Sequence, residues 1–106
     1  MIYESHVRGW TMRMKAIPKD IRGTFAAFAH PAAIRHLTDL GVTTVEFMPI
    51  HAYVQDRHLV ERGLSNFWGY NTIGFFAPEE RYIDGGGLPE IAAAIDALHE
   101  AGIEVI

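Results

Sequence analysis

The sequence contains no cysteine, which excludes disulfide bridges, a thiolate nucleophile and zinc–thiolate sites. No apolar run reaches the roughly 18 residues that a membrane span requires, and residues 1–15 lack the apolar core and cleavage site of a signal peptide. The nine Lys and Arg residues are scattered and the net charge is −4, so no concentrated basic face predicts nucleic-acid binding. These absences predict a cytoplasmic protein that binds neither membranes nor nucleic acid.

The composition is that of one globular domain. The chain is 49% apolar and 21% charged, which is typical of a folded protein and unlike a disordered or fibrous one. A chain of 106 residues can bury a modest core. We therefore expect residues 1–106 to form one domain at most.

Two helices are predicted from apolar residues that recur about every 3.6 positions. In residues 30–41, "HPAAIRHLTDLG", Pro31 lies in the first turn and Gly41 ends the helix. Residues 85–102, "GGGLPEIAAAIDALHEAG", likewise have a proline at the helix start and a glycine after its end. The residues expected on the buried faces are Ile34, Leu37 and Leu40 in the first helix, and Leu88, Ile91, Ala92, Ile95 and Leu98 in the second.

Three segments are rich enough in β-branched and apolar residues to predict strands: residues 2–7, 42–50 and 103–106. Pro49 indicates that the hydrogen-bonded part of the second strand ends near it. Each helix is followed by a glycine and then a strand, and this repeated unit builds parallel sheets. We therefore expect an α/β fold with parallel strands that are covered on both faces.

The connections from strand to helix are long. The first spans residues 8–29, with room for one short turn of helix, and the second follows Ile50 for more than thirty residues. Long structureless connections are uncommon and usually functional. Both leave the carboxyl ends of parallel strands, where α/β folds place their active sites.

Residues 65–82, "SNFWGYNTIGFFAPEERY", lie in the second connection and hold half of the Phe, Trp and Tyr residues of the chain. Aromatic faces beside amide and hydroxyl groups suit a sugar, whose C–H face packs on a ring while its hydroxyls form hydrogen bonds. The aromatic side chains expected only to anchor this loop on the sheet are Phe67, Phe75 and Phe76. Trp68 and Tyr70, which carry polar groups, are candidates for binding as well as for support.

The candidates for carboxylate chemistry are Glu4, Glu46 and Glu104, one on each predicted strand. Glycoside hydrolysis uses two carboxylates, but these three could equally bond to neighbouring cations or backbone groups. His51, just after the second strand, is the histidine best placed for a site, whereas His30, His36 and His99 are expected to face solvent. No histidine pair has metal-ligand spacing on a helix, and residues 85–87, "GGG", predict a turn rather than a phosphate loop. No metal or cofactor is therefore expected.

Three segments together resemble one known family: "IYESHVRGWT", "GVTTVEFMPIHAYVQDRHLVERGLSNFWGYNTIGFFAPEERY" and "LHEAGIEVI". They are similar to isoamylase-type glycogen debranching enzymes of the α-amylase superfamily, in register over essentially all 106 residues. The most specific part is "VEFMPI" followed by "FWGYNTIGFFAPE", and "RGTFAAFAHPAAIRHL" fits the bacterial glycogen-operon branch of that family.

The resemblance implies a (β/α)₈ barrel, which needs about 250 residues. Residues 1–106 would then be an incomplete N-terminal segment, from the first strand to the opening of the third. The catalytic Asp, Glu and Asp of the family come from later strands, so the resemblance implies no catalytic residue here and structural roles for Glu4, Glu46 and Glu104. The residues that it implies for substrate binding are Tyr70, which matches a sugar-stacking Tyr, its neighbours Trp68 and Asn71, and the rim residues His51 and Asp56.

The function implied is that of a segment of a glycosidase. The whole enzyme would hydrolyse α-1,6 branch linkages of glycogen or related α-glucans with retention of configuration, whereas this segment alone would be inactive. The alternative is a stand-alone module that binds α-glucan, or takes part in assembly, without catalysis. An open strand edge and an uncovered apolar face would lead the segment to self-associate.

Overall fold

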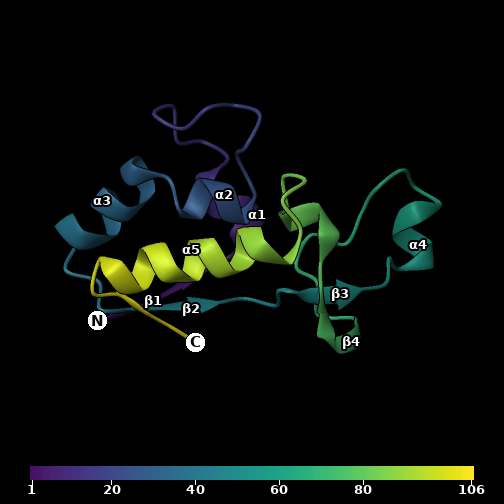
Figure 1. Cartoon of the computed structure of the whole chain (residues 1–106). Coiled ribbons are helices and arrows are strands. Elements are labelled where there is room, and N and C mark those ends of the chain that lie inside the picture. Colours follow the sequence, from purple (N-terminus) through teal and green to yellow (C-terminus); the bar gives the residue numbers. More distant parts are fainter.

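The computed structural model describes all residues from 1 to 106, arranged as helices of different lengths and two small sheets (Figure 1). The elements in chain order are β1 Ile2–Ser5, α1 Val7–Thr11, α2 Phe25–Phe28, α3 Pro31–Asp39, β2 Thr44–Phe47, β3 His51–Tyr53, α4 Arg57–Val60, β4 Thr72–Pro78, the 3₁₀ helix η1 Glu80–Tyr82, α5 Leu88–Glu100 and β5 Glu104–Val105.

The first sheet is parallel, with strand order β1-β2-β5. Tyr3 lies opposite Val45, and Thr44 lies opposite Glu104. This confirms the parallel α/β arrangement that the helix–glycine–strand repeat predicts. The strands are shorter than expected, because β1 ends at Ser5 and β2 covers only 44–47 of the predicted 42–50.

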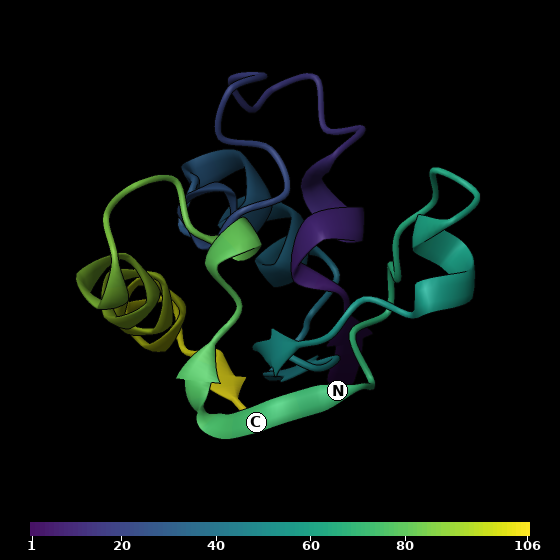
Figure 2. The ribbon, with the colours of Figure 1, turned by 90° about the vertical axis from the view of Figure 1, so that its right-hand side faces the viewer.

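Helices cover one face of the parallel sheet. In Figures 1 and 2, α1, α2, α3 and α5 all lie on the same side of β1 and β2. The expectation that both faces are covered is therefore wrong. The core lies between these helices and the sheet, and its large, fully buried side chains include those of Phe25, Phe28, Leu37, Val45, Tyr82, Leu98 and Ile103.

The opposite face of the sheet carries three glutamates together with exposed isoleucines near its ends. Glu4, Glu46 and Glu104 alternate along their strands with residues that face the core, and all three are exposed. Ile2 and Ile106, which share this alternation, are 61% and 63% exposed. The uncovered face is therefore mixed, with both charged and apolar side chains, rather than apolar throughout.

The two long helices form where the sequence predicts, but their buried faces differ. In α3, His30 at the N-cap accepts a hydrogen bond from the Ala32 N–H at 3.2 Å. This histidine is half-buried, and the expectation that it faces solvent is therefore wrong. Leu40 is 47% exposed and Leu88 is 65% exposed. In α5 the stripe against the core consists of Ile91, Ala94, Leu98 and Ala101 rather than the predicted set with Leu88 and Ala92.

The difference in α5 has a simple origin. Residues 91–95 are all apolar, so the 3.6-residue period fits more than one stripe. Contact between α2 and α5 selects the stripe with the small, fully buried Ala94. The Glu90 carboxylate lies close to the start of this helix and accepts hydrogen bonds from the backbone of Ala26, Asp84 and Gly86. It thereby holds the glycine turn and α2 against the start of α5.

The first long connection contains two short helices. Val7, predicted to end a strand, instead begins α1, and α2 forms at Phe25–Phe28. The Thr11 hydroxyl accepts a hydrogen bond from the Gly23 N–H at 2.8 Å and closes the intervening loop. A second, smaller core of Ile17, Ala27 and Ala33 lies beneath it.

The second connection is not a loop throughout. Its strands β3 and β4 form an antiparallel hairpin with irregular register, and α4 lies between them along the chain. Phe75 and Phe76 on β4 are exposed, at 72% and 106%, so they do not anchor the segment on the sheet as predicted. The hairpin forms beyond the end of β2 and carries residues 51–78 outward (Figure 1). No helix in the structure is both long and apolar enough to cross a membrane.

Candidate functional site

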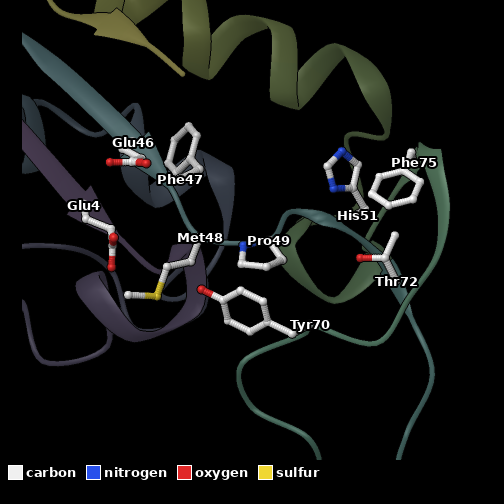
Figure 3. Close-up of a pocket in the computed structure, with 9 residues that line it drawn as sticks. All are labelled: Glu4, Glu46, Phe47, Met48, Pro49, His51, Tyr70, Thr72 and Phe75. Carbon is white, nitrogen blue, oxygen red and sulfur yellow. The ribbon is translucent and has the colours of Figure 1, made fainter.

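A hollow of about 530 Å³ lies where the carboxyl ends of β1 and β2 meet the β3–β4 hairpin (Figure 3). The residues that line it are Glu4, Glu46, Phe47, Met48, Pro49, His51, Tyr70, Thr72 and Phe75. The parallel sheet contributes the two carboxylates and the Phe47 ring, and the other aromatic and imidazole rings come from the hairpin and from the segment before β4. The position at the carboxyl ends of parallel strands is the one that the sequence predicts for a site.

Two of the five predicted binding residues, Tyr70 and His51, line this hollow. The Tyr70 side chain is 67% exposed, and Figure 3 shows its hydroxyl pointing toward Met48. The His51 ring meets Phe75 edge-on, with 5.5 Å between ring centroids. An exposed aromatic face, a phenol and an imidazole are therefore available to a ligand in the hollow.

The other three predicted residues lie outside the hollow. The Asp56 carboxylate accepts hydrogen bonds from the side-chain amides of Asn71 at 2.7 Å and Asn66 at 2.9 Å. Trp68 is 54% exposed, and its ring lies edge-on to that of Phe67. Asp56 and Asn71 therefore bond to each other within the protein.

Asn66 organises the turn before Tyr70. Its backbone N–H donates to the Gln55 side chain at 2.7 Å, and its carbonyl accepts from the Tyr53 hydroxyl at 2.9 Å. Its side-chain oxygen accepts from the Gly69 N–H at 3.0 Å. Gly69 has a φ of +78°, and a Cβ there would lie 3.0 Å from the Tyr53 ring. Conformation and space thus both favour glycine at this position.

His6 was not predicted to take part in the site, yet it contacts the same turn. This histidine follows β1, is 6% exposed, and lies 2.8 Å through Nε2 from the Phe67 carbonyl oxygen. Burial lowers the pKa of His6, and the nearby Arg8 cation lowers it further, against a hydrogen bond to Phe67 that raises it. The signal available in the sequence was a histidine near the end of the predicted strand 2–7, just before the first long connection.

An ion pair between the buried Glu79 and the partly exposed Arg81 lies just after β4 and supports the hairpin. The Glu79 carboxylate accepts hydrogen bonds from the Arg81 guanidinium and from the backbone N–H groups of Arg81 and Tyr53. Burial raises the pKa of Glu79, but the hydrogen bonds from Arg81 outweigh it and the net shift is downward. The Arg81 guanidinium lies 4.3 Å from the centre of the Tyr53 ring. Burial also raises the pKa of the Tyr82 phenol next to this pair.

Glu4 and Glu46 enter the hollow although the family resemblance implies structural roles for them. Their carboxylates accept hydrogen bonds, which suits a ligand rich in hydroxyl groups. The third carboxylate, Glu104, does not line the hollow. No group of three or more His, Asp or Glu side chains is arranged to hold a metal ion.

Comparison with curated proteins gives matches along the whole chain. The glycogen operon protein GlgX homolog of Mycobacterium bovis is 49% identical over 110 aligned positions, which cover 100% of this chain and 15% of that protein. The glycogen debranching enzyme of Yersinia pseudotuberculosis is also 49% identical, with 100% of this chain and 17% of that protein covered.

The chain is a relative of the glycogen debranching enzymes. This confirms the recognition predicted from the sequence motifs. No family model matches the chain. The chain spans 15% to 17% of the length of the glycogen debranching enzymes and the GlgX homolog that it matches.

Solved structures share the fold. A type I pullulanase of Bacillus subtilis, complexed with maltose, superposes with a TM-score of 0.78 at 25% identity, covering 98% of this chain and 16% of that one. The catalytic module of the glycogen-degrading pneumococcal virulence factor SpuA gives a TM-score of 0.72 at 31% identity, covering 99% of this chain and 17% of that one. Like the glycogen debranching enzymes, these proteins are much longer than the present chain.

Proposed function

We propose that residues 1–106 are the N-terminal segment of a (β/α)₈ catalytic barrel. The whole protein hydrolyses α-1,6 branch linkages of glycogen or related α-glucans with retention of configuration. Identity of 49% to a glycogen debranching enzyme over the whole chain carries this proposal. The parallel sheet with helices on one face supports it, because a barrel wall has its helices outside and its second face toward the barrel axis.

The hollow is the proposed α-glucan contact of this segment. Tyr70 offers an exposed ring for stacking on a sugar, and His51 and the two carboxylates offer polar groups for its hydroxyls. Trp68 extends the aromatic surface, while Asp56 and Asn71 act from behind by holding the turn. A neighbour of similar fold, the type I pullulanase, was solved with maltose.

We further propose that the segment alone has no glycosidase activity. A retaining mechanism needs a carboxylate nucleophile and an acid about 5 Å apart. In the resemblance these groups belong to later strands, and Glu4 and Glu46 do not match the catalytic positions. Positioning of the substrate by Tyr70 would then serve a reaction whose acid and nucleophile lie elsewhere in the enzyme.

Two measurements test the proposed function. The 106-residue protein is titrated with maltotetraose and followed by ¹H–¹⁵N NMR, and reducing-sugar release from glycogen is assayed in parallel. We expect shifts at the Tyr70 amide and around the hollow, with affinity of about millimolar because only part of a cleft is present, and no sugar release. Release of reducing sugar from glycogen by the pure 106-residue protein would overturn the proposal that the segment alone is inactive.

The product of the complete coding sequence is assayed on the same glycogen. Selective loss of α-1,6 branch points, with the β-anomer absent from the first product formed, supports a retaining debranching enzyme. An inactive full-length product that still binds maltotetraose would instead support the alternative, an α-glucan-binding or assembly module without catalysis.

Self-association of the 106-residue protein is a further part of the proposal. The free edges of β1 and β5 leave backbone groups without a strand partner in the sheet. Because the open face carries glutamates, we place the contact at these edges rather than at an apolar face. Sedimentation velocity at several protein concentrations measures the self-association. A monomer at every concentration would contradict this part of the proposal.

A further inference from the structure

His6 joins the end of β1 to the turn that presents Trp68 and Tyr70. Its Nε2 lies 2.8 Å from the Phe67 carbonyl oxygen. Its ring stacks on the Phe67 ring with centroids 4.3 Å apart and planes 13° from parallel. The edge of the same imidazole meets the Trp68 ring at 5.8 Å. One buried side chain thus contacts two consecutive residues that lie sixty positions away in the sequence.

We propose that His6 is a positioning residue for the segment 66–71, which we call the platform segment. It holds the segment so that the rings of Trp68 and Tyr70 keep a fixed place beside the hollow. The sugar-binding consequence rests on the proposed function, whereas the ordering of the platform segment by His6 does not.

The hydrogen bonds of His6 fix its tautomer and orientation. The Gly9 N–H donates to Nδ1 at 3.1 Å, so Nδ1 carries no proton in this arrangement. The proton therefore lies on Nε2, which donates to the Phe67 carbonyl. The Tyr82 hydroxyl lies 3.3 Å from the same nitrogen, and its ring meets the imidazole edge-on. An imidazole held on three sides can direct the turn that it bonds to.

The platform segment has few other means of holding its aromatic part. Phe67, Trp68 and Tyr70 are all exposed, so burial in the core does not order them. The hydrogen bonds of Asn66 fix the start of the segment, and the Asp56–Asn71 bond fixes its end. Between these points, residues 67–70 form one side-chain hydrogen bond with the rest of the protein, from His6 to the Phe67 carbonyl. The bond between the Asn66 side chain and the Gly69 N–H lies within the platform segment itself.

The test uses two substitutions that separate the contacts of His6. In His6→Asn the side chain remains a favoured N-cap and can still accept from the Gly9 N–H, but it is too short to reach the Phe67 carbonyl. In His6→Gln the longer amide can donate to that carbonyl. The control is His30→Asn, because His30 also caps a helix through Nδ1 and has no contact with the platform segment.

The first readout is ¹⁵N relaxation of the backbone amides of residues 66–71 and of the indole N–H of Trp68. We expect His6→Asn to lower the heteronuclear NOE across the platform segment while β3 and β4 keep theirs, and His6→Gln to restore much of it. His30→Asn should leave the segment unchanged. Equal order of residues 66–71 in wild type and His6→Asn would overturn the proposal, as would an equal loss in the His30→Asn control.

The second readout is affinity for maltotetraose. We expect a fall of about tenfold in His6→Asn, with recovery to within about threefold in His6→Gln, because a loosened platform must be ordered on binding. If wild type does not bind maltotetraose, the proposed function fails and the relaxation data alone decide the role of His6. If it binds and His6→Asn binds equally well with a disordered platform segment, the positioning role is wrong.

Discussion

Glu4 and Glu46 lie opposite each other in the parallel register of β1 and β2, and both are exposed on the face that carries no helix. Like charges directly opposite on adjacent strands destabilise a sheet. We therefore expect Glu46→Gln to raise the Tm by about 2–4 °C at low salt, and by less at high salt because ions screen exposed charges.

The matched control for this pair is Glu104→Gln. Glu104 lies opposite Thr44 and has no carboxylate across from it, so its substitution should leave the Tm unchanged. Thermal unfolding followed by circular dichroism measures all three proteins. An equal rise in both variants would show that net charge, and not the Glu4–Glu46 contact, controls stability.

Tyr70 supplies the exposed ring on the wall of the hollow. Tyr70→Ala should reduce the affinity for maltotetraose by about tenfold, because a stacking face is lost. Phe76→Ala is the control, since Phe76 is fully exposed and does not line this hollow. Isothermal titration calorimetry compares the two, and a larger loss in Phe76→Ala would place the sugar on the outer side of β4 instead.

Glu79 is the buried acceptor of the hairpin. Glu79→Ala should lower the free energy of unfolding by about 2 kcal/mol, because the Arg81 guanidinium and the Tyr53 N–H lose their partner. Urea denaturation measures this change. Glu80→Ala, at the exposed neighbouring carboxylate, should change the free energy of unfolding by less than about 0.5 kcal/mol. Similar losses in both variants would contradict the role of Glu79.

His6 should make stability depend on pH. Its pKa in the folded protein lies below the ordinary value of 6.5, chiefly because of burial. The unfolded chain therefore takes up a proton first as the pH falls. The contribution of neutral His6 to the free energy of unfolding is fully present above about pH 6.5. It is lost as the pH falls from there through the lowered pKa of the folded protein. The groups that face the imidazole are the Arg8 cation, the Tyr82 phenol and the Phe67 carbonyl.

Urea denaturation at intervals from pH 8 to pH 5 measures this dependence. His6→Asn should flatten the part of the curve below pH 6.5, and the five other histidines are common to both proteins, so the difference belongs to His6. The same pH dependence in both proteins would mean that another group is responsible.

Local sequence predicts much of the fold and the place of the candidate site. Pro31 and Gly41 delimit α3 through backbone preferences that act within a few residues. The glycines that follow α3 and α5, and the β-branched strand after each, predict the parallel arrangement that the sheet shows. The end of the sheet at which Tyr70 and His51 line the hollow follows from the position of the long connections after strands.

Other parts depended on contacts between distant residues. Strand β4 was missed because its residues 72–78 include two exposed Phe and a Gly, with no clear alternation of core and surface. It forms through pairing with β3 and through the Glu79–Arg81 pair at its end. His6 was overlooked because its partner Phe67 is sixty-one positions away.

The sequence by itself determined the helix ends, the parallel strand order and the kinship with glycogen debranching enzymes, because each depends on residue types at fixed short spacing. Tertiary structure alone decided which stripe of α5 is buried, which glutamates face each other and how His6 meets Phe67. These features arise when separate elements pack against one another. Local preferences do not distinguish between the possible arrangements, and close packing of the core selects one of them.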